Sequence, residues 1–352
     1  MGEINSISTN MIFETSNLLS ALQPSLTVSK ILGLCPAVTI YRSKVKYSRC
    51  GILYSFILCF AFIYFFLWAD EGSTDPFHYP SKSVLEKTSR KISKYSAIVK
   101  VTVILGSSCY GQKRLFKLIK TIIQIDNEFS TLNIRISYAR VKRFAIFLLI
   151  VFFITEVLLD FMITFLLRPK SRHLQITTFS KPLKYSIPHC IKFQAVSEFL
   201  IFLLILHDRF RIVNKELMGL NEETLKKSSI LIYKKDPLFI NIRSQKKLNP
   251  KSKIEELSQL HDKLCDLSKE VNSLYSLSLL IVIGSIFLEV TFSLYITTTL
   301  LIRQKTRDVA TVYITKKLYR AVSSIMMCIV LGAGCSITAN AVSNLCCNIF
   351  IY

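Results

Sequence analysis

The feature that most constrains the fold is a run of 19 residues, 51–69, that contains no charged side chain. As an α-helix at 1.5 Å per residue it would be about 28 Å long, enough to cross the hydrocarbon core of a bilayer. The whole chain of 352 residues is 51% hydrophobic and only 19% charged, which is too apolar for a soluble domain of this size. The sequence therefore predicts a membrane protein.

Segment length and the exclusion of charge predict an all-α bundle of membrane helices. The second of its expected spans contains Lys100, close enough to one end for the ammonium group to reach the lipid headgroups. Residues 1–30 lack the pattern of a removable signal peptide, so the first span is expected to remain. The expected spans are 51–69, 95–111, 144–167, 186–206, 276–302 and 321–339.

Basic residues predict the orientation, because lysine and arginine are richer in cytoplasmic segments. With the N-terminus in the cytosol, the inside segments hold 27 basic residues and the outside segments hold 16. This orientation makes 1–50 a cytosolic segment, followed by a transmembrane bundle over 51–339. The formal net charge of +22 is then explained by contact with anionic membrane lipids rather than with nucleic acid.

Two helices are expected to extend from the membrane into the cytosol, near 207–217 and 254–275. The second extension carries apolar residues at alternating spacings of three and four, a heptad seam that predicts packing against another helix. Antiparallel pairing of the two extensions would bury the apolar stripe of each. The polar, lysine-rich segment between them, 218–253, is expected to be a flexible linker. The seam consists of Leu257, Leu260, Leu264, Leu267, Val271 and Leu274.

No catalytic, cofactor or metal site is expected. His261 and Cys265 share a helix face, but a metal would need further ligands and a Cys–His nucleophile would need an orienting pocket. None of the ten cysteines forms a CxxC spacing, so neither a zinc module nor a disulfide framework is indicated. These two side chains are therefore interpreted as packing residues.

Acidic side chains inside the expected spans are the main functional candidates, because each is costly in a bilayer and normally faces a cavity or a partner. Glu156 and Asp160 lie one helical turn apart in the third span. Two interpretations stay open: the acids line a ligand pocket or a cation path, or they pair purely structurally with Lys100, Lys192 or backbone groups. Together with one aromatic residue, the candidates are Glu156, Asp160, Glu198, Glu289 and Tyr295.

Four stretches resemble the insect gustatory receptor family in wording and order. They are SKILGLCPAVTIYRS (29–43), LIKTIIQIDNEF (118–129), FLIFLLILHDRFRIVNKEL (199–217) and LHDKLCDLSKEVNSLYSLSLLIVIGSIFLEVTFSLY (260–295). The resemblance implies a seven-helix subunit of a tetrameric ligand-gated cation channel, a homomer or a heteromer with other gustatory receptors. It also implies detection of small-molecule tastants at the plasma membrane of sensory neurons. In such a protein the helix over 254–275 would be the assembly helix, and the seventh helix would line the pore.

The end of the sequence departs from the family pattern. Residues 337–352 hold no charge, and the glutamine of the family's seventh helix has no counterpart after Gln304. The interpretation is a chain with six of the expected seven spans, truncated before its pore helix, with 340–352 as an atypical tail. Such a chain would not conduct by itself.

Three other classes of membrane protein are alternatives. An insect odorant receptor would share the architecture, whereas an ion-coupled transporter would show broken helices and repeats that are not visible. A G-protein-coupled receptor is disfavoured because the Asp208-Arg209-Phe210 sequence follows the fourth span rather than the third.

Overall fold

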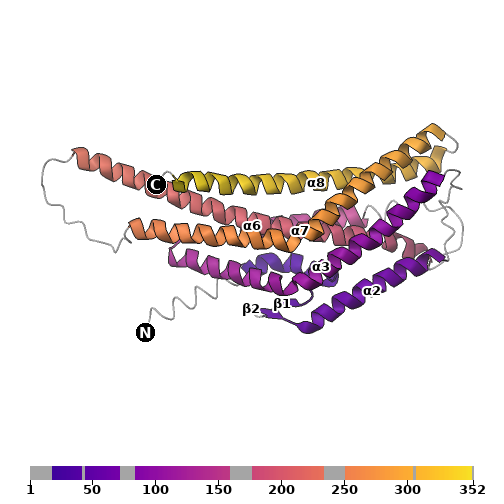
Figure 1. The fold of residues 1–352 in the computed structure, drawn as a ribbon, viewed down its shortest axis with the longest axis horizontal. Helices are drawn as coiled ribbons and strands as arrows, with labels where there is room; N and C mark the ends of the chain where they lie inside the picture. Colours follow the sequence, from indigo (N-terminus) through magenta and orange to yellow (C-terminus); the bar gives the residue numbers. More distant parts are fainter. Residues whose placement is uncertain are drawn as a thin grey trace.

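The protein is a bundle of long helices with one short hairpin in this computed structural model, which describes residues 18–41, 44–71, 84–158, 177–233, 250–303 and 307–350. A first helix covers 18–31. Figure 1 shows α6, α7 and α8 running together along the long axis of the molecule. The later helices are α2 (Arg49–Glu71), α3 (Val84–Thr131), α4 (Ala139–Phe152), the π-helix η1 (Phe153–Leu158), α6 (Thr177–Tyr233), α7 (Pro250–Arg303) and α8 (Arg307–Phe350).

Four of these helices are long and apolar enough to cross a membrane: Arg49–Leu67, Ser186–Leu220, Lys253–Thr299 and Lys317–Ser343. They contain the whole of the fourth and sixth predicted spans and most of the first and fifth. Helix α3 covers the predicted second span but does not meet the same measure. The predicted third span coincides with α4 and η1 as far as residue 158, and its remainder lies outside the described residues.

The segment before the first span is folded, which sequence analysis did not predict. Strands β1 (Val38–Tyr41) and β2 (Lys44–Tyr47) pair antiparallel, so the expectation of an all-α fold misses one hairpin. The Ser55 hydroxyl donates to the carbonyl of Gly33 at 2.7 Å, and the Ala37 amide donates to Gln112 Oε1 at 3.0 Å. These bonds fix the chain before the hairpin to α2 and α3.

The helix over 18–31 is part of the hydrophobic core. Leu18, Leu19 and Leu22 are at most 2% exposed. The Gln194 side-chain amide of α6 donates to the hydroxyl of Ser25 at 3.0 Å and to that of Ser29 at 2.7 Å. Apolar burial and buried hydrogen bonds therefore tie this helix to α6.

The long helices extend further than the sequence indicated. Helix α7 runs unbroken from Pro250 to Arg303, which confirms that the predicted extension leads directly into the fifth span. Helix α6 continues to Tyr233, so 218–233 is helical instead of linker, and α8 continues to Phe350 without a break at 339. The linker was predicted to begin at 218 because the sequence becomes polar there. Glutamate, lysine and leucine are nevertheless good helix formers, so a polar sequence can continue a helix.

Helices α6 and α7 pack against each other beyond the apolar spans, as predicted. Phe210 and Val213 of α6 and Leu257 of α7 are each 0% exposed. The ring of Phe210 meets the ring of His261 edge-on, with centroids 6.0 Å apart. The apolar stripe of each extension is therefore buried by the neighbouring helices of one chain.

A buried ion pair joins α3 to α6 at the same end of the bundle. Arg209 Nε and Nη2 donate to the two carboxylate oxygens of Asp126 at 3.0 and 2.9 Å, and the Tyr138 hydroxyl donates to Asp126 at 2.7 Å. The side chains of Arg209 and Asp126 are 1% and 4% exposed. The neighbouring Asp208 instead pairs with the exposed Arg140. The Asp-Arg-Phe sequence thus serves helix packing.

Replacing Asp126 with asparagine is expected to lower the free energy of unfolding by about 3–5 kcal/mol, because it leaves a buried guanidinium without its counter-charge. The matched control is Arg140→Gln, which breaks an exposed pair and should cost about 1 kcal/mol or less. Thermal unfolding of the purified proteins in lipid nanodiscs measures both. Equal losses in the two variants would contradict the importance assigned to the buried pair.

Candidate functional site

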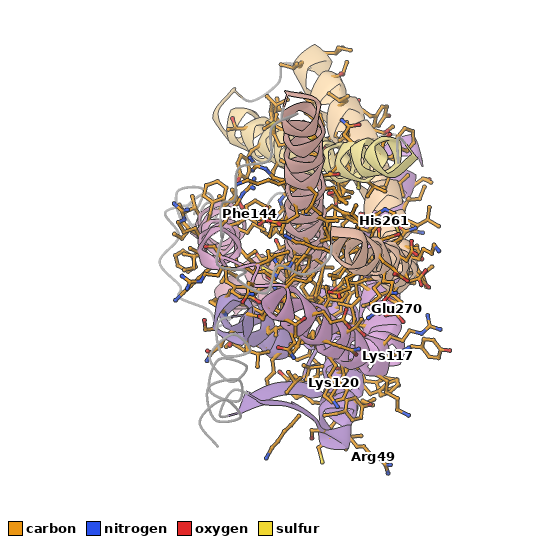
Figure 2. The ribbon with its side chains drawn as sticks, turned by 90° about the vertical axis from the view of Figure 1, so that its left-hand side faces the viewer. Arg49, Lys117, Lys120, Phe144, His261 and Glu270 are labelled. Atoms are coloured by element: carbon orange, nitrogen blue, oxygen red, sulfur yellow. The ribbon has the colours of Figure 1, made fainter. Side chains whose placement is uncertain are left out.

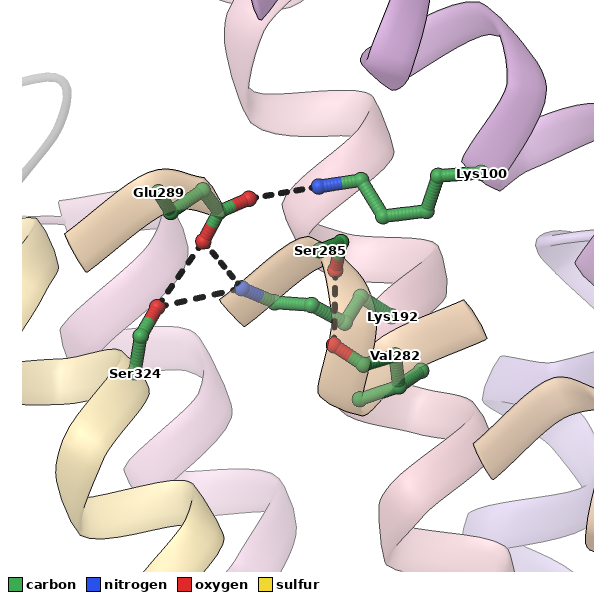
Figure 3. Close-up of polar contacts among 6 residues, drawn as sticks. All are labelled: Lys100, Lys192, Val282, Ser285, Glu289 and Ser324. Atoms are coloured by element: carbon green, nitrogen blue, oxygen red, sulfur yellow. Dashed lines mark hydrogen bonds and ion pairs between the residues drawn. The ribbon is translucent and has the colours of Figure 1, made fainter. Parts of the chain in front are cut away.

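A polar cluster lies within the membrane-spanning part of the bundle and draws one side chain from each of four helices (Figure 3). Glu289 of α7 accepts from the Lys100 ammonium of α3 at 2.6 Å and from the Lys192 ammonium of α6 at 2.8 Å. The Ser324 hydroxyl of α8 donates to the same carboxylate at 2.9 Å and lies 3.2 Å from Lys192 Nζ. We call these four residues the Glu289 cluster.

Helix geometry explains why residues so distant in sequence meet. Each lies 14 to 17 residues from one end of its helix: the start of α3, α6 and α8, and the end of α7. Because Figure 1 shows these four ends at the same end of the bundle, the rise of 1.5 Å per residue places all four at a depth of about 20–25 Å. Antiparallel packing then aligns them in one layer.

The two lysines of the cluster are buried, whereas the glutamate is partly exposed. The side chains of Lys100 and Lys192 are 3% and 1% exposed, whereas that of Glu289 is 20% exposed. Arg320 of α8 lies within electrostatic range of the cluster. Cationic groups therefore outnumber carboxylates around this point among the described residues.

The prediction that Lys100 reaches the lipid headgroups is wrong. Its side chain turns into the bundle and ends on Glu289. The reason is energetic: a carboxylate within reach inside the bundle offers a charge-assisted hydrogen bond, which the sequence alone could not place opposite this lysine. The sequence had left pairing of Glu289 with Lys100 or Lys192 open, and the two contacts show that Glu289 meets both lysines.

The remaining candidates lie apart from this cluster or outside the described part. Glu198 of α6 accepts from the Tyr275 hydroxyl at 3.3 Å, and its other carboxylate oxygen has no partner among the described residues. Tyr295 of α7 is half-buried, six residues beyond Glu289. The side chain of Glu156 and the whole of Asp160 lie outside the described residues.

Sequence reasoning did not select Ser324 at all, and it treated the two lysines only as structural partners. A usable signal existed for the lysines: each is a cation inside a span that is otherwise nearly free of charge. Ser324 carries no such signal, since hydroxyl side chains commonly satisfy themselves on their own helix backbone.

The seam of α7 is satisfied inside one chain. Leu257, Leu260, Leu264, Leu267 and Val271 are at most 3% exposed, and Leu274 is half-buried. Leu274 packs against Gly111 of α3 so closely that a β-carbon on Gly111 would lie 2.7 Å from its Cδ1 atom. Any contact of this helix with another subunit must therefore use a face other than the seam.

His261 and Cys265 are neighbours on α7, with 3.4 Å between Nε2 and Sγ. His261 is 8% exposed and packs on Phe210. Among the described residues, no group of three or more histidine, cysteine or acidic side chains is placed to hold a metal ion. The pair contributes to helix packing.

Comparison with known families identifies the class of protein. The 7tm chemosensory receptor family matches residues 22–347, so the chain belongs to this family. The family consists of multi-pass membrane proteins that are chemosensory receptors rather than enzymes. The family match covers the last span, and it does not support the prediction of truncation before a seventh helix.

Among individual relatives, the chain is similar to a Drosophila melanogaster protein that carries the name gustatory receptor 28a. The two are 24% identical over 310 residues, an alignment that covers 79% of this chain. The chain spans 66% of the length of that relative.

Glu289→Gln is expected to lower the free energy of unfolding by about 3–5 kcal/mol, because it leaves two buried ammonium groups without a carboxylate. Lys100→Met should cost far less, about 1 kcal/mol or below, since it leaves one balanced pair of Lys192 and Glu289. Thermal unfolding in nanodiscs compares the two variants. A larger loss for the lysine variant would show that the carboxylate is not the shared centre of the cluster.

Proposed function

We propose that this protein is a gustatory receptor that detects small-molecule tastants as a subunit of a tetrameric ligand-gated cation channel. It acts in the plasma membrane of sensory neurons, as a homomer or together with other gustatory receptors. The observation that carries the proposal is the convergence of Lys100, Lys192, Glu289 and Ser324 from four helices inside the membrane. Buried ionisable groups in a membrane protein commonly mark a ligand or ion pathway.

The orientation supports a ligand site reached from outside the cell. With the N-terminus in the cytosol, the starts of α3, α6 and α8 and the end of α7 face the exterior, and the Glu289 cluster lies toward that side. A ligand that contacts all four helices can change their packing, and such differential contact is what a receptor needs to shift between two states.

The cytosolic part of α7 remains the proposed assembly helix, with one change from the sequence-based proposal. Its seam packs inward, so the outer face would make the contact between subunits. That face carries the charged residues Asp262, Asp266 and Lys269, whose side chains are 76–79% exposed. Contacts of charged groups across subunits would favour particular pairings of receptors.

Expression of the chain in cultured cells, alone and with other gustatory receptors, is expected to give tastant-evoked cation currents in at least one combination. Glu289→Gln should change the tastant concentration that evokes half of the maximal current by roughly tenfold, which corresponds to about 1.4 kcal/mol of binding free energy. The matched control is Lys117→Gln on α3, which removes an exposed ion pair with Glu270 (Figure 2). Lys117 lies 17 residues beyond Lys100 on the same helix, or about 25 Å at 1.5 Å per residue. Absence of current in every combination, with protein at the cell surface, would refute the channel proposal.

An epitope tag at the N-terminus is expected to stay unlabelled by antibody in unpermeabilised cells. The same tag inserted within 72–83, between α2 and α3, should be labelled, because this segment follows the first outward crossing. Flow cytometry before and after permeabilisation measures both. Surface labelling of the N-terminal tag would reverse the proposed orientation.

A further inference from the structure

The Glu289 cluster is unbalanced in charge. Two ammonium groups, Lys100 and Lys192, share the single carboxylate of Glu289 among the described residues. Arg320, which has other interactions of its own, adds positive potential from α8. A net positive charge held among packed helices in a membrane is costly, because it is removed from bulk water.

The cluster is also unbalanced in hydrogen bonding. A lysine ammonium has three N–H donors. Among the described residues, Lys100 Nζ makes one hydrogen bond, to Glu289, and Lys192 Nζ makes two, to Glu289 and Ser324. Within the described part of the chain, three N–H groups on two side chains that are at most 3% exposed are left for another acceptor.

We propose that Lys100 and Lys192 bind the carboxylate of a small organic anion, so that the tastants of this receptor are organic acids in their ionised form. The inference rests on the proposed function and names the ligand class of the same site. A carboxylate carries one negative charge and two acceptor oxygens, each able to accept more than one hydrogen bond. It therefore matches both the excess charge and the donors left on the two lysines.

Other ligand classes fit the cluster less well. A metal cation would meet two ammonium groups and one carboxylate, and would be repelled on balance. A neutral sugar or alcohol could accept hydrogen bonds but would leave the excess charge in place. A lipid phosphodiester has the right charge, but the two lysines point inward to α7 rather than toward the outer surface of the bundle.

Glu289 acts as an internal competitor in this arrangement. It occupies the lysines when no ligand is present, and an incoming carboxylate must share them with it. Loss of Glu289 should therefore strengthen anion binding, whereas loss of either lysine should weaken it. A purely structural ion pair predicts no such opposite effects on binding, because both kinds of variant would only destabilise the fold.

The test is thermal unfolding of the purified full-length chain in phosphatidylcholine nanodiscs, with matched pairs of probes. Sodium acetate, lactate and benzoate are compared with acetamide, lactamide and benzamide, with sodium chloride holding the ionic strength constant. A ligand that binds the folded state raises the unfolding midpoint in proportion to its saturation. We expect at least one carboxylate to raise the midpoint while its amide does not.

Variants then locate the effect. Lys192→Gln and Lys100→Gln should each weaken the carboxylate affinity by roughly tenfold or more, the loss of one charge-assisted hydrogen bond. Glu289→Gln should show a larger rise in midpoint than the unsubstituted protein at the same carboxylate concentration. The exposed Lys117→Gln removes the same charge elsewhere and should change nothing.

Several results would overturn the inference. One is that no carboxylate exceeds its amide, and another is that the lysine variants bind the anion as well as the Lys117→Gln control does. If both lysine variants fail to fold, the test is the comparison of unfolding midpoints of the unsubstituted protein with each carboxylate and with its amide. Stabilisation by phosphatidylglycerol in the nanodisc, lost in the lysine variants and not given by soluble carboxylates, would assign the site to lipid instead.

This outcome is separate from the failure of the proposed function. The unfolding measurement needs no current, so an anion that binds while every receptor combination stays silent would refute only the channel proposal. Currents evoked by neutral tastants alone, with no binding of carboxylates, would refute only the ligand class.

Discussion

The sharing of one carboxylate by two lysines is the interaction on which the membrane part of this protein depends. Glu289 connects α7 to α3 and α6 through ion pairs and to α8 through Ser324. The surrounding surface is apolar, with Leu280 and Phe287 of α7 67% and 69% exposed and therefore turned toward lipid. Inside a bilayer, apolar side chains do little to select one helix partner over another. A buried charged side chain is more selective, because few other side chains can pair with it.

Helix α7 links this cluster to the other end of the bundle. It runs without interruption from Glu289 back to Leu257, about 48 Å at 1.5 Å per residue. At that end α7 packs through its seam and lies beside α3 and α6, which the Arg209–Asp126 ion pair connects. A change in the packing of α7 at the cluster can therefore reach the other end of the bundle through a single rigid element.

The order and kind of the main helices were predictable, because uncharged runs and the three-four spacing of leucines are local signals. The folded N-terminal segment was not predictable in the same way. Ser25 and Ser29 lie in a helix whose packing depends on Gln194, more than 160 residues away. The end of α6 was misjudged for a different reason: a polar sequence resembles a linker, although its residues favour a helix.

By itself, the sequence determined that the chain spans a membrane, that α7 joins a helical extension to a membrane helix, and that acids and lysines lie within apolar spans. Each follows from residue type and spacing along a single segment. Only the tertiary structure decided which charges meet, since Lys100, Lys192, Glu289 and Ser324 come from four helices whose alignment depends on antiparallel packing. It also decided that the leucine seam faces inward, because a heptad pattern specifies that a helix has a partner but not which helix that partner is.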